Sequence, residues 1–357
     1  MIAGLNLGYK AFVSNFNLLK QPYKLTFAIT YRCNSRCKTC GIWRKKSGNE
    51  LRLDEIKKFA KKSDFFSWFN LTGGEPFLRK DIVGIAQAFL ENSSNFYLFN
   101  TTSNGYTPDI IAKRVEEILS LKIPRCIVGI SLDGYKELHE RIRGVKGSWD
   151  KAIKSFKLLK ALSKEHKNFQ TFFGYTISPI NIGEFKKTYL SVKEVIPEIE
   201  PKDFHVNLLH TSEHYFSNID NKFNLKSSAR EVVKELGLIE SMRKNGSINP
   251  AIFTQNFLEK NYVKFSKPFI KNNRTPLACK VLQTSIFLDP YGNVFPCTIF
   301  NKLLGNIRNS RYELKKIIET EDAKALRKEI LELKCPNCWT PCEAYQTILG
   351  NLLAVVV

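Results

Sequence analysis

The stretch KLTFAITYRCNSRCKTC, residues 24–40, decides how this chain is interpreted. Its first seven residues are mostly apolar or β-branched, which predicts a buried strand. The loop after this strand carries Cys33, Cys37 and Cys40 in the spacing C-x3-C-x2-C. Structural zinc sites usually combine two C-x2-4-C pairs. Three thiolates on one short loop suit instead a 4Fe–4S cluster in which one iron has no protein ligand, since thiolates are the usual ligands of such clusters. A structural or zinc-binding triplet remains the alternative.

Strand-like and helix-like runs alternate on both sides of this loop. The strand-like runs cover 24–30, 67–76, 96–105, 126–134, 171–179 and 203–210, and the helix-like runs cover 53–62, 81–92, 108–120, 148–165 and 181–195. Such alternation predicts an α/β fold with a parallel sheet and right-handed crossovers. Six units rather than eight predict a partial (β/α)6 TIM-like barrel that is open on one side.

Polar motifs follow the predicted strands at the points where those strands end. They are the cysteine loop, Thr72-Gly73-Gly74-Glu75-Pro76, Thr102-Ser103-Asn104-Gly105, Ser131-Leu132-Asp133-Gly134, and Thr176 with Asn181. In an open parallel sheet, ligands gather at the carboxyl ends of the strands. The sequence therefore predicts one ligand site built from all of these motifs.

The cysteine triplet after a first strand, together with GGEP, resembles the radical S-adenosylmethionine (radical SAM) superfamily. The resemblance implies a 4Fe–4S cluster on Cys33, Cys37 and Cys40 that binds S-adenosylmethionine through its unique iron. It also implies a set of cofactor-binding residues: Gly73, Gly74 and Glu75 for the methionyl amino group, Ser103 and Asn104 for the ribose, Arg143 for the methionyl carboxylate, Trp43 for the adenine side, and Ser131 as a further polar contact. Arg141 is the competing choice to Arg143. Ser103 and Asn104 also suit a simple Asn-Gly turn.

A second group of cysteines lies near the C-terminus. Cys279-x12-Gly292-x4-Cys297 is followed by Cys335-x2-Cys338-x3-Cys342, which resembles the SPASM/twitch class of auxiliary-cluster domains. A full SPASM domain has seven cysteines and two clusters, so five cysteines imply one auxiliary 4Fe–4S cluster. Cys279 and Cys297 would be joined by two of the remaining three thiols, and a zinc site is the alternative. DPYGNVFPC, residues 289–297, predicts a tight hairpin with Gly292 in its turn.

The expected function follows from the resemblance. The reduced cluster would cleave S-adenosylmethionine to a 5′-deoxyadenosyl radical, which abstracts hydrogen from a peptide, a protein side chain or a lipid. An external one-electron reductant of the flavodoxin or ferredoxin type would be a partner. Two other interpretations stay open: a non-catalytic iron–sulfur electron-transfer protein, and a zinc-stabilised nucleic-acid-binding module. The second leaves the β/α units unexplained, so nucleic acid is not the expected partner.

The charge of the chain bears on its surroundings. The net charge is +21, and the first 49 residues contain nine Lys or Arg and no Asp or Glu. This excess suits an anionic cluster, an anionic partner or a merely solvated basic surface. Residues 2–19 show apolar residues at helical spacing, which predicts a helix that either packs across one end of the barrel or contacts an anionic membrane surface.

We expect five segments along the chain. They are an N-terminal amphipathic segment (1–23), the partial barrel (24–210), a bridging region (211–275) with helices near 226–244 and 255–265, the auxiliary-cluster domain (276–345) and an apolar C-terminal tail (346–357). No apolar run is long enough to cross a bilayer, and no secretory signal is evident. Nine cysteines without these signals favour metal binding in the cytoplasm, with peripheral membrane contact as an addition. Cys126, which stands apart from both groups, is expected to be a buried apolar residue.

Overall fold

The structure, a computed structural model, describes residues 2–221, 223–243 and 253–356. Its centre is a parallel sheet whose first six strands follow one another in space as they do in the sequence. These strands are β1 (Lys24–Thr30), β2 (Trp68–Gly73), β3 (Leu98–Ser103), β4 (Arg125–Ser131), β5 (Phe169–Ile177) and β6 (Phe204–Leu208). The predicted partial (β/α)6 barrel is confirmed, because every neighbouring pair in this series is parallel.

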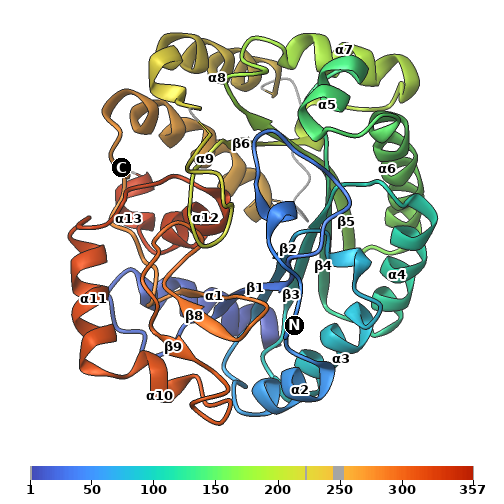
Figure 1. The fold of residues 1–357 in the computed structure, drawn as a ribbon. Helices are drawn as coiled ribbons and strands as arrows, with labels where there is room; N and C mark the ends of the chain where they lie inside the picture. The colour runs from blue at the N-terminus through green and yellow to red at the C-terminus, as the bar shows by residue number, and fades with distance from the viewer. Residues whose placement is uncertain (1, 222, 244–252, 357) are drawn as a thin grey trace.

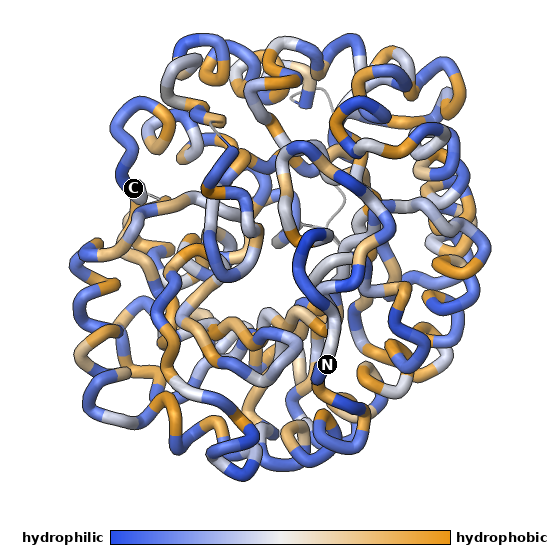
Figure 2. Tube along the Cα trace, viewed as in Figure 1, coloured by the Kyte–Doolittle hydropathy of each residue, from blue (hydrophilic) through white to orange (hydrophobic). Residues whose placement is uncertain are grey.

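The helices between these strands cover the outer face of the sheet (Figure 1). They are α2 (Leu53–Lys61), α3 (Ile82–Asn92), α4 (Pro108–Ser120), α5 (Lys136–Arg143), α6 (Ser148–Glu165) and α7 (Phe185–Val195). Apolar and polar residues alternate along them (Figure 2), so that one face of each helix joins the core. On β1, Leu25, Phe27 and Ile29 are fully buried, and the Phe27 ring meets the Phe89 ring of α3 edge to face.

The C-terminal cysteine segment continues the same sheet. β7 (Ser285–Leu288) pairs in parallel with β1, and β8 (Asn293–Phe295) and β9 (Gly305–Asn306) follow in antiparallel pairing. The predicted hairpin is confirmed between β7 and β8, where Gly292 has a φ of +88°. The pairing of β7 with β1 was not predicted. One nine-stranded sheet therefore runs from the barrel into the C-terminal segment, and the predicted border at residue 276 stays a prediction.

Helices close the side of the barrel that lies beyond β6. α8 (Ala229–Arg243) and α9 (Phe253–Asn272) fall in the bridging region, close to the predicted helices. The hydroxyl of Tyr262 on α9 accepts a hydrogen bond from the backbone N–H of Leu208 on β6 and donates one to the backbone oxygen of Trp339. α9 therefore joins the last barrel strand to the C-terminal cysteine segment. The remaining helices of this half are α10 (Lys315–Ile318), α11 (Glu321–Leu331), α12 (Pro341–Leu349) and α13 (Leu352–Val356).

The first helix, α1 (Ile2–Ser14), packs at the amino-terminal ends of the strands. Lys10 Nζ donates hydrogen bonds to the backbone oxygen of Phe65 and to Ser67 Oγ, directly before β2. Asn15, just past the helix, donates to the backbone oxygen of Leu349 at the end of α12. In the described part of the chain, no helix combines the length and the apolar character that a bilayer crossing requires.

Candidate active site

The cysteine loop leaves the carboxyl end of β1 and is held by backbone hydrogen bonds from two other segments. Arg36 N and Lys38 N donate to the backbone oxygens of Arg143 and Ile142 at the end of α5, at 2.9 and 2.8 Å. Gly41 N donates to the backbone oxygen of Phe216, also at 2.8 Å. Gly144 caps the end of α5. Its φ of +67° is favoured by glycine, and a Cβ there would lie 2.5 Å from the Arg36 carbonyl oxygen. Backbone hydrogen bonds to the end of α5 and to Phe216 thus hold the cysteine loop in place.

The three thiols of this loop lie near enough to one another to interact electrostatically. Burial raises the pKa of Cys33 to about 11 and that of Cys40 to about 12, and the neighbouring Cys37 adds to both rises. Cys33 and Cys40 therefore carry protons at neutral pH when no cation is present. A bound cation reverses this, because a metal-coordinating thiol is deprotonated. Clustered thiols of this kind fit the three-cysteine ligand set of an iron–sulfur cluster.

The GGE turn lies directly against the cysteine loop. Gly74 N and Glu75 N donate to the backbone oxygens of Thr30 and Arg32, both at 2.8 Å. A Cβ on Gly74 would lie 2.3 Å from the Arg32 oxygen, and Gly73 has a φ of +135° with its Cβ position 2.1 Å from the Thr30 oxygen. Only glycine fits this close approach between two backbones.

Glu75 is fully buried and organises the motif that follows β3. Its carboxyl group accepts hydrogen bonds from Asn104 N at 2.7 Å, from Ser103 Oγ at 2.9 Å and from Phe77 N at 3.2 Å. Burial raises its pKa to about 7, against the opposing effect of these donors. Asn104 also reaches the cysteine loop, since its amide donates to Asn34 Oδ1 at 2.7 Å. The structure thus brings together the three predicted residues Glu75, Ser103 and Asn104.

Arg143 lies between an acidic partner and the cysteine loop. One terminal nitrogen lies 2.7 Å from Asp133 Oδ2, in a pair whose side chains are 15% and 4% exposed. The other lies 3.8 Å from Cys37 Sγ, and Nε has no hydrogen-bond partner within the described residues. Arg141, the competing choice, is exposed on the surface. The arginine that can meet a ligand beside the cysteines is therefore Arg143.

Two further predicted residues border the same region. Trp43 belongs to a short 3-10 helix, η1 (Ile42–Arg44), and its indole N–H donates to the Cys40 carbonyl oxygen at 3.0 Å. Its ring is flanked by the guanidinium groups of Arg36 and Arg44, at 5.1 and 4.8 Å from the ring centre. Ser131 is the last residue of β4 and so lies at the carboxyl edge of the sheet.

Several residues of this site were not predicted. Asp133 was quoted within its motif but not as the partner of Arg143. The irregular segment after β6 supplies three more: Tyr215, whose hydroxyl lies 2.6 Å from Thr72 Oγ1; Phe216, which holds Gly41; and Asn218, whose amide donates to the Thr39 carbonyl oxygen at 2.9 Å. This segment has no periodic pattern, so its sequence carries no signal of the contact.

Polar side chains line the interior of the barrel, nearer to the amino ends of the strands than the motifs are. Asn100 Nδ2 donates to Asn70 Oδ1 at 2.6 Å, and the Trp68 indole N–H donates to Asn100. Lys24, which is 1% exposed, donates to Gln346 Oε1 at 2.9 Å. Burial lowers the pKa of this lysine. Since alternate residues of a strand point to one face, Lys24, Asn70 and Asn100 share the inner face of the sheet.

The three histidines after β5 have different surroundings. His205 Nδ1 lies 3.2 Å from Glu259 Oε1, Nε2 lies 2.9 Å from the Gln255 amide, and its ring stacks on Phe172 at 3.7 Å. His210 and His214 are spaced as on a helix, but the structure has no helix there. Both instead contact the C-terminal cysteine segment. His210 Nε2 accepts from Trp339 N, and His214 Nε2 lies 2.9 Å from the Cys297 carbonyl oxygen.

Four of the five C-terminal cysteines line one small internal cavity, together with Glu343. They are Cys279, Cys297, Cys335 and Cys338. Four thiols around one cavity match the number of ligands that a 4Fe–4S cluster takes. Cys342 does not line this cavity. It lies toward the barrel interior, where its sulfur is 3.9 Å from Asn70 Nδ2. The isolated Cys126 is fully buried in β4, as predicted.

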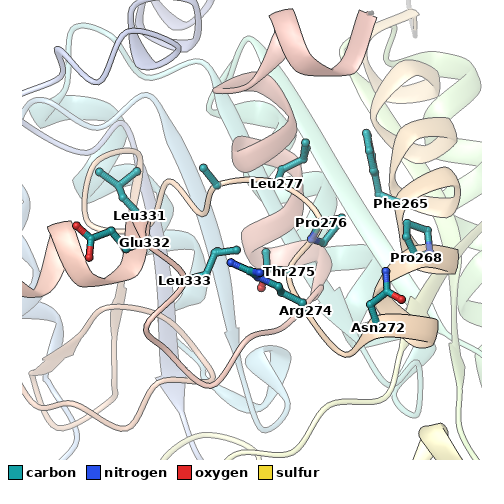
Figure 3. A pocket seen from close by; sticks show the side chains of 11 residues that line it. Phe265, Pro268, Asn272, Arg274, Thr275, Pro276, Leu277, Leu331, Glu332 and Leu333 are labelled. Atoms are coloured by element: carbon teal, nitrogen blue, oxygen red, sulfur yellow. The ribbon is translucent and has the colours of Figure 1, made fainter.

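A larger cavity of about 690 Å³ opens next to these cysteines. Figure 3 shows that its lining side chains come from α9 on one side, including Phe265 and Pro268, and on the other from the end of α11 at Leu331 and from Leu333 just after it. Thr275 lines both this cavity and the cysteine cavity, and its hydroxyl donates to the Cys338 carbonyl oxygen. This cavity therefore lies beside the C-terminal cysteines rather than at the loop of Cys33.

Comparisons with known proteins agree with this arrangement. Residues 27–192 match the family model of the radical SAM superfamily, and residues 279–339 match SPASM, an iron–sulfur cluster-binding domain. The chain is 26% identical to the subtilosin biosynthesis protein AlbA of Bacillus subtilis over 84% of its own length and 60% of that protein. It thus spans less than two thirds of AlbA. It is 24% identical to the AdoMet-dependent heme synthase of Methanosarcina barkeri, over 89% of this chain and 88% of that one.

The fold also matches solved structures. The structure of anSMEcpe with bound AdoMet and the Kp18Cys peptide superimposes on this chain with a TM-score of 0.61 at 16% sequence identity. The match covers 94% of this chain and 98% of that one. Residues 27–192 thus form a domain of the radical S-adenosylmethionine superfamily, and residues 279–339 form a SPASM-type iron–sulfur cluster-binding domain.

Proposed function

We propose that Cys33, Cys37 and Cys40 hold the cluster at which S-adenosylmethionine is cleaved, and that a hydrogen atom is then abstracted from a substrate inside the barrel. The observation that carries this proposal is the convergence of the three thiols with Glu75 and Arg143 at the carboxyl ends of the strands. When bound, the cluster supplies one electron and S-adenosylmethionine supplies the 5′-deoxyadenosyl radical. The residues of the chain bind and orient S-adenosylmethionine and the substrate, and they exclude water from the site.

We assign the cofactor contacts residue by residue. Gly73 and Gly74 let the cofactor approach the backbone, and Glu75 accepts a hydrogen bond from its ammonium group. Arg143 offers a guanidinium fork to the methionyl carboxylate, with Asp133 holding that fork in place. Ser103 and Asn104, already arranged around Glu75, offer hydroxyl and amide groups to the ribose. Trp43 covers the adenine side, and Ser131 is a further polar contact.

We propose that one auxiliary 4Fe–4S cluster binds to Cys279, Cys297, Cys335 and Cys338. These four thiols line a single cavity, whereas Cys342 faces Asn70 in the barrel interior. Of the three choices that the sequence left open, Cys342 is thus the thiol without a ligand role. An external one-electron donor of the flavodoxin or ferredoxin type would supply the electrons.

The substrate class that we favour is a peptide or a protein side chain. The barrel interior carries amide, ammonium and carboxylate groups, including Asn70, Asn100, Lys24 and Glu259. Such groups match the polar backbone and side chains of a peptide better than a hydrocarbon chain, because a buried polar group that loses its partner costs free energy. Two similar proteins support this choice: AlbA takes part in the synthesis of a bacteriocin, and anSMEcpe has been solved with a peptide.

A lipid is the second candidate substrate, and one observation favours it. α1 exposes a row of large apolar side chains, among them Ile2 at 83% and Phe12 at 59%. We therefore also propose that the chain makes peripheral contact with an anionic membrane, consistent with the basic N-terminal segment.

The test is hydrogen transfer from defined candidate substrates. Anaerobically reconstituted protein would receive reductant, S-adenosylmethionine and either a peptide pool or a lipid extract, each prepared with deuterium at carbon. We expect the peptide pool to increase the release of 5′-deoxyadenosine and to place deuterium in it. Deuterium transfer from the lipid extract alone would establish the second candidate. Two intact clusters with no 5′-deoxyadenosine under any condition would support an electron-transfer protein, and a colourless zinc protein would support the nucleic-acid-binding alternative.

A further inference from the structure

One face of α1 is apolar and exposed along its whole length. Ile2, Leu5, Tyr9, Phe12 and Phe16 follow one another at intervals of three and four residues, and they are 83, 69, 66, 59 and 51% exposed. Leu18, at 69%, extends the row. The first five, at intervals of three and four, lie on one face of α1 and of the turn that continues it, and Leu18 follows that turn. We call these six residues the exposed row.

The opposite face of α1 fixes the helix to the protein. A Cβ on Gly4 would lie 2.9 Å from the Tyr97 ring, so the helix passes close to the segment before β3. Ala11 and Ser14 are buried, and Lys10 reaches Phe65 and Ser67 as described above. Detachment of the helix is therefore not the reason why the row is exposed. The helix is held on one face while its apolar side chains point outward.

Basic groups surround the end of the exposed row. Arg327 donates to the backbone oxygens of Leu19 and Asn17, Lys280 donates to Asn17 Oδ1, and Lys20 is exposed. No Asp or Glu occurs in the first 49 residues. Apolar side chains next to basic ones, without acidic neighbours in sequence, are typical of helices that lie in the interface of an anionic bilayer. A second copy of the chain, which is equally basic, would bring like charges together.

We propose that the exposed row of α1 docks on the surface of an anionic bilayer, with its apolar side chains inserted at the level of the headgroups. This assignment of a surface rests on the peripheral contact proposed above. It also fixes the orientation of the enzyme. α1 contacts the amino ends of β2 and β3, whereas the loop of Cys33, Cys37 and Cys40 lies at the carboxyl ends. In this orientation the barrel mouth faces the water, so a peptide substrate would reach it directly, whereas a lipid would first have to leave the bilayer.

The experiment is sedimentation of the full chain with two kinds of vesicles, phosphatidylcholine alone and phosphatidylcholine with phosphatidylglycerol. The test variant is Phe12→Gln with Phe16→Gln. The matched control is Ile110→Gln with Leu190→Gln, which removes two apolar side chains of similar exposure, 51 and 49%, from α4 and α7. We expect the wild type and the control to bind the anionic vesicles equally. The test variant should bind them at least about tenfold more weakly. All three should cleave S-adenosylmethionine equally in the absence of vesicles.

Each other outcome overturns a stated part of the account. If the wild type binds neither kind of vesicle, both the peripheral contact and the docking surface are wrong. If it binds but the test variant binds as well as the control, the contact stands and α1 is the wrong surface. If the wild type is a dimer in solution that the test variant dissociates, the exposed row is an interface between two copies.

Discussion

At the scale of single residues, the site depends on buried charges that hold one another in place. Arg143 is charged at any physiological pH, and Asp133 is its carboxylate partner at 2.7 Å. Both side chains are mostly shielded from water, so each compensates the desolvation of the other. Among the residues that the structure describes, Glu75 has no cationic partner at hydrogen-bond distance, and it relies on hydrogen bonds from Ser103, Asn104 and Phe77. These two arrangements lead to different predictions.

Replacing Asp133 by Asn should be strongly destabilising. The change leaves the Arg143 guanidinium buried without a counter-charge, which typically costs about 3–5 kcal/mol of unfolding free energy. Chemical denaturation of the variant would measure this loss. The control is Asp150→Asn, which breaks the pair with Lys136, whose side chains are 49–55% exposed. Such exposed pairs contribute less than about 1 kcal/mol. Equal losses in the two variants would contradict the structural role of Asp133.

Replacing Glu75 by Gln should change how stability depends on pH. The pKa of Glu75 in the cluster-free protein is raised from 4.5 to about 7, mainly by burial. The folded state then binds a proton that the unfolded state releases, so the contribution of Glu75 to stability falls as the pH rises from 4.5 through 7. The wild type should lose up to about 3 kcal/mol relative to the variant over that range. A difference in unfolding free energy that is constant between pH 5 and 8 would contradict a raised pKa.

At the scale of elements, the site is made by turns that lie against one another at the ends of strands. β1 and β2 end side by side, and the turn after β2 donates one backbone hydrogen bond to the last residue of β1 and one to the loop after it. Two glycines allow this approach. On the C-terminal side, the segments before and after the hairpin of β7 and β8 supply Cys279 and Cys297 to the same cavity as the later pair of cysteines.

Replacing Gly74 by Ala should separate the GGE turn from the cysteine loop. The new Cβ would lie 2.3 Å from the Arg32 carbonyl oxygen, so one backbone must move. We expect the affinity for S-adenosylmethionine to fall about tenfold or more, which corresponds to about 1.4 kcal/mol. Equilibrium dialysis with the reconstituted protein would measure it. Gly48→Ala is the control, since no atom lies within 4 Å of that added Cβ. Unchanged affinity in the Gly74 variant would show that the turn does not position the cofactor.

Replacing single C-terminal cysteines should distinguish ligands from the thiol that is not a ligand. Cys338→Ala should lose the auxiliary cluster and about half of the iron and sulfide, because its thiol lines the shared cavity. Cys342→Ala should keep its full iron and sulfide content, because the Cys342 sulfur of the wild type faces Asn70. Iron and sulfide counts on the two reconstituted variants decide the matter. Loss of a cluster in Cys342→Ala would contradict the assignment.

At the scale of the whole molecule, one sheet runs from the strand before the first cysteine group to the hairpin between Cys279 and Cys297. The six barrel strands were predictable because apolar, β-branched runs alternate with amphipathic helices, as for the run 148–165, which the structure places in α6 with the same bounds. Fixed spacings indicated the cysteine triplet and the GGE turn. These signals are local, so they remain visible in a single sequence.

Contacts between distant segments could not be predicted in the same way. The pairing of β7 with β1 depends on which edge of the sheet is free, and four-residue strands carry little pattern of their own. The contact of Tyr215 and Phe216 with the cysteine loop arises from an irregular segment. The apolar row on α1 was visible as a helical pattern, but only the packing of the other helix face determines that the row is exposed.

The most direct test of the central claim is electron–nuclear double resonance on the reduced enzyme with S-adenosylmethionine labelled with ¹⁵N in its amino group. The claim is that Cys33, Cys37 and Cys40 leave one iron open and that the methionyl amino group fills this position. It predicts a hyperfine coupling between the label and the cluster spin in the wild type, absent in Cys37→Ala and retained in Cys338→Ala. A wild-type cluster that binds the labelled cofactor without any coupling to its nitrogen would contradict the account.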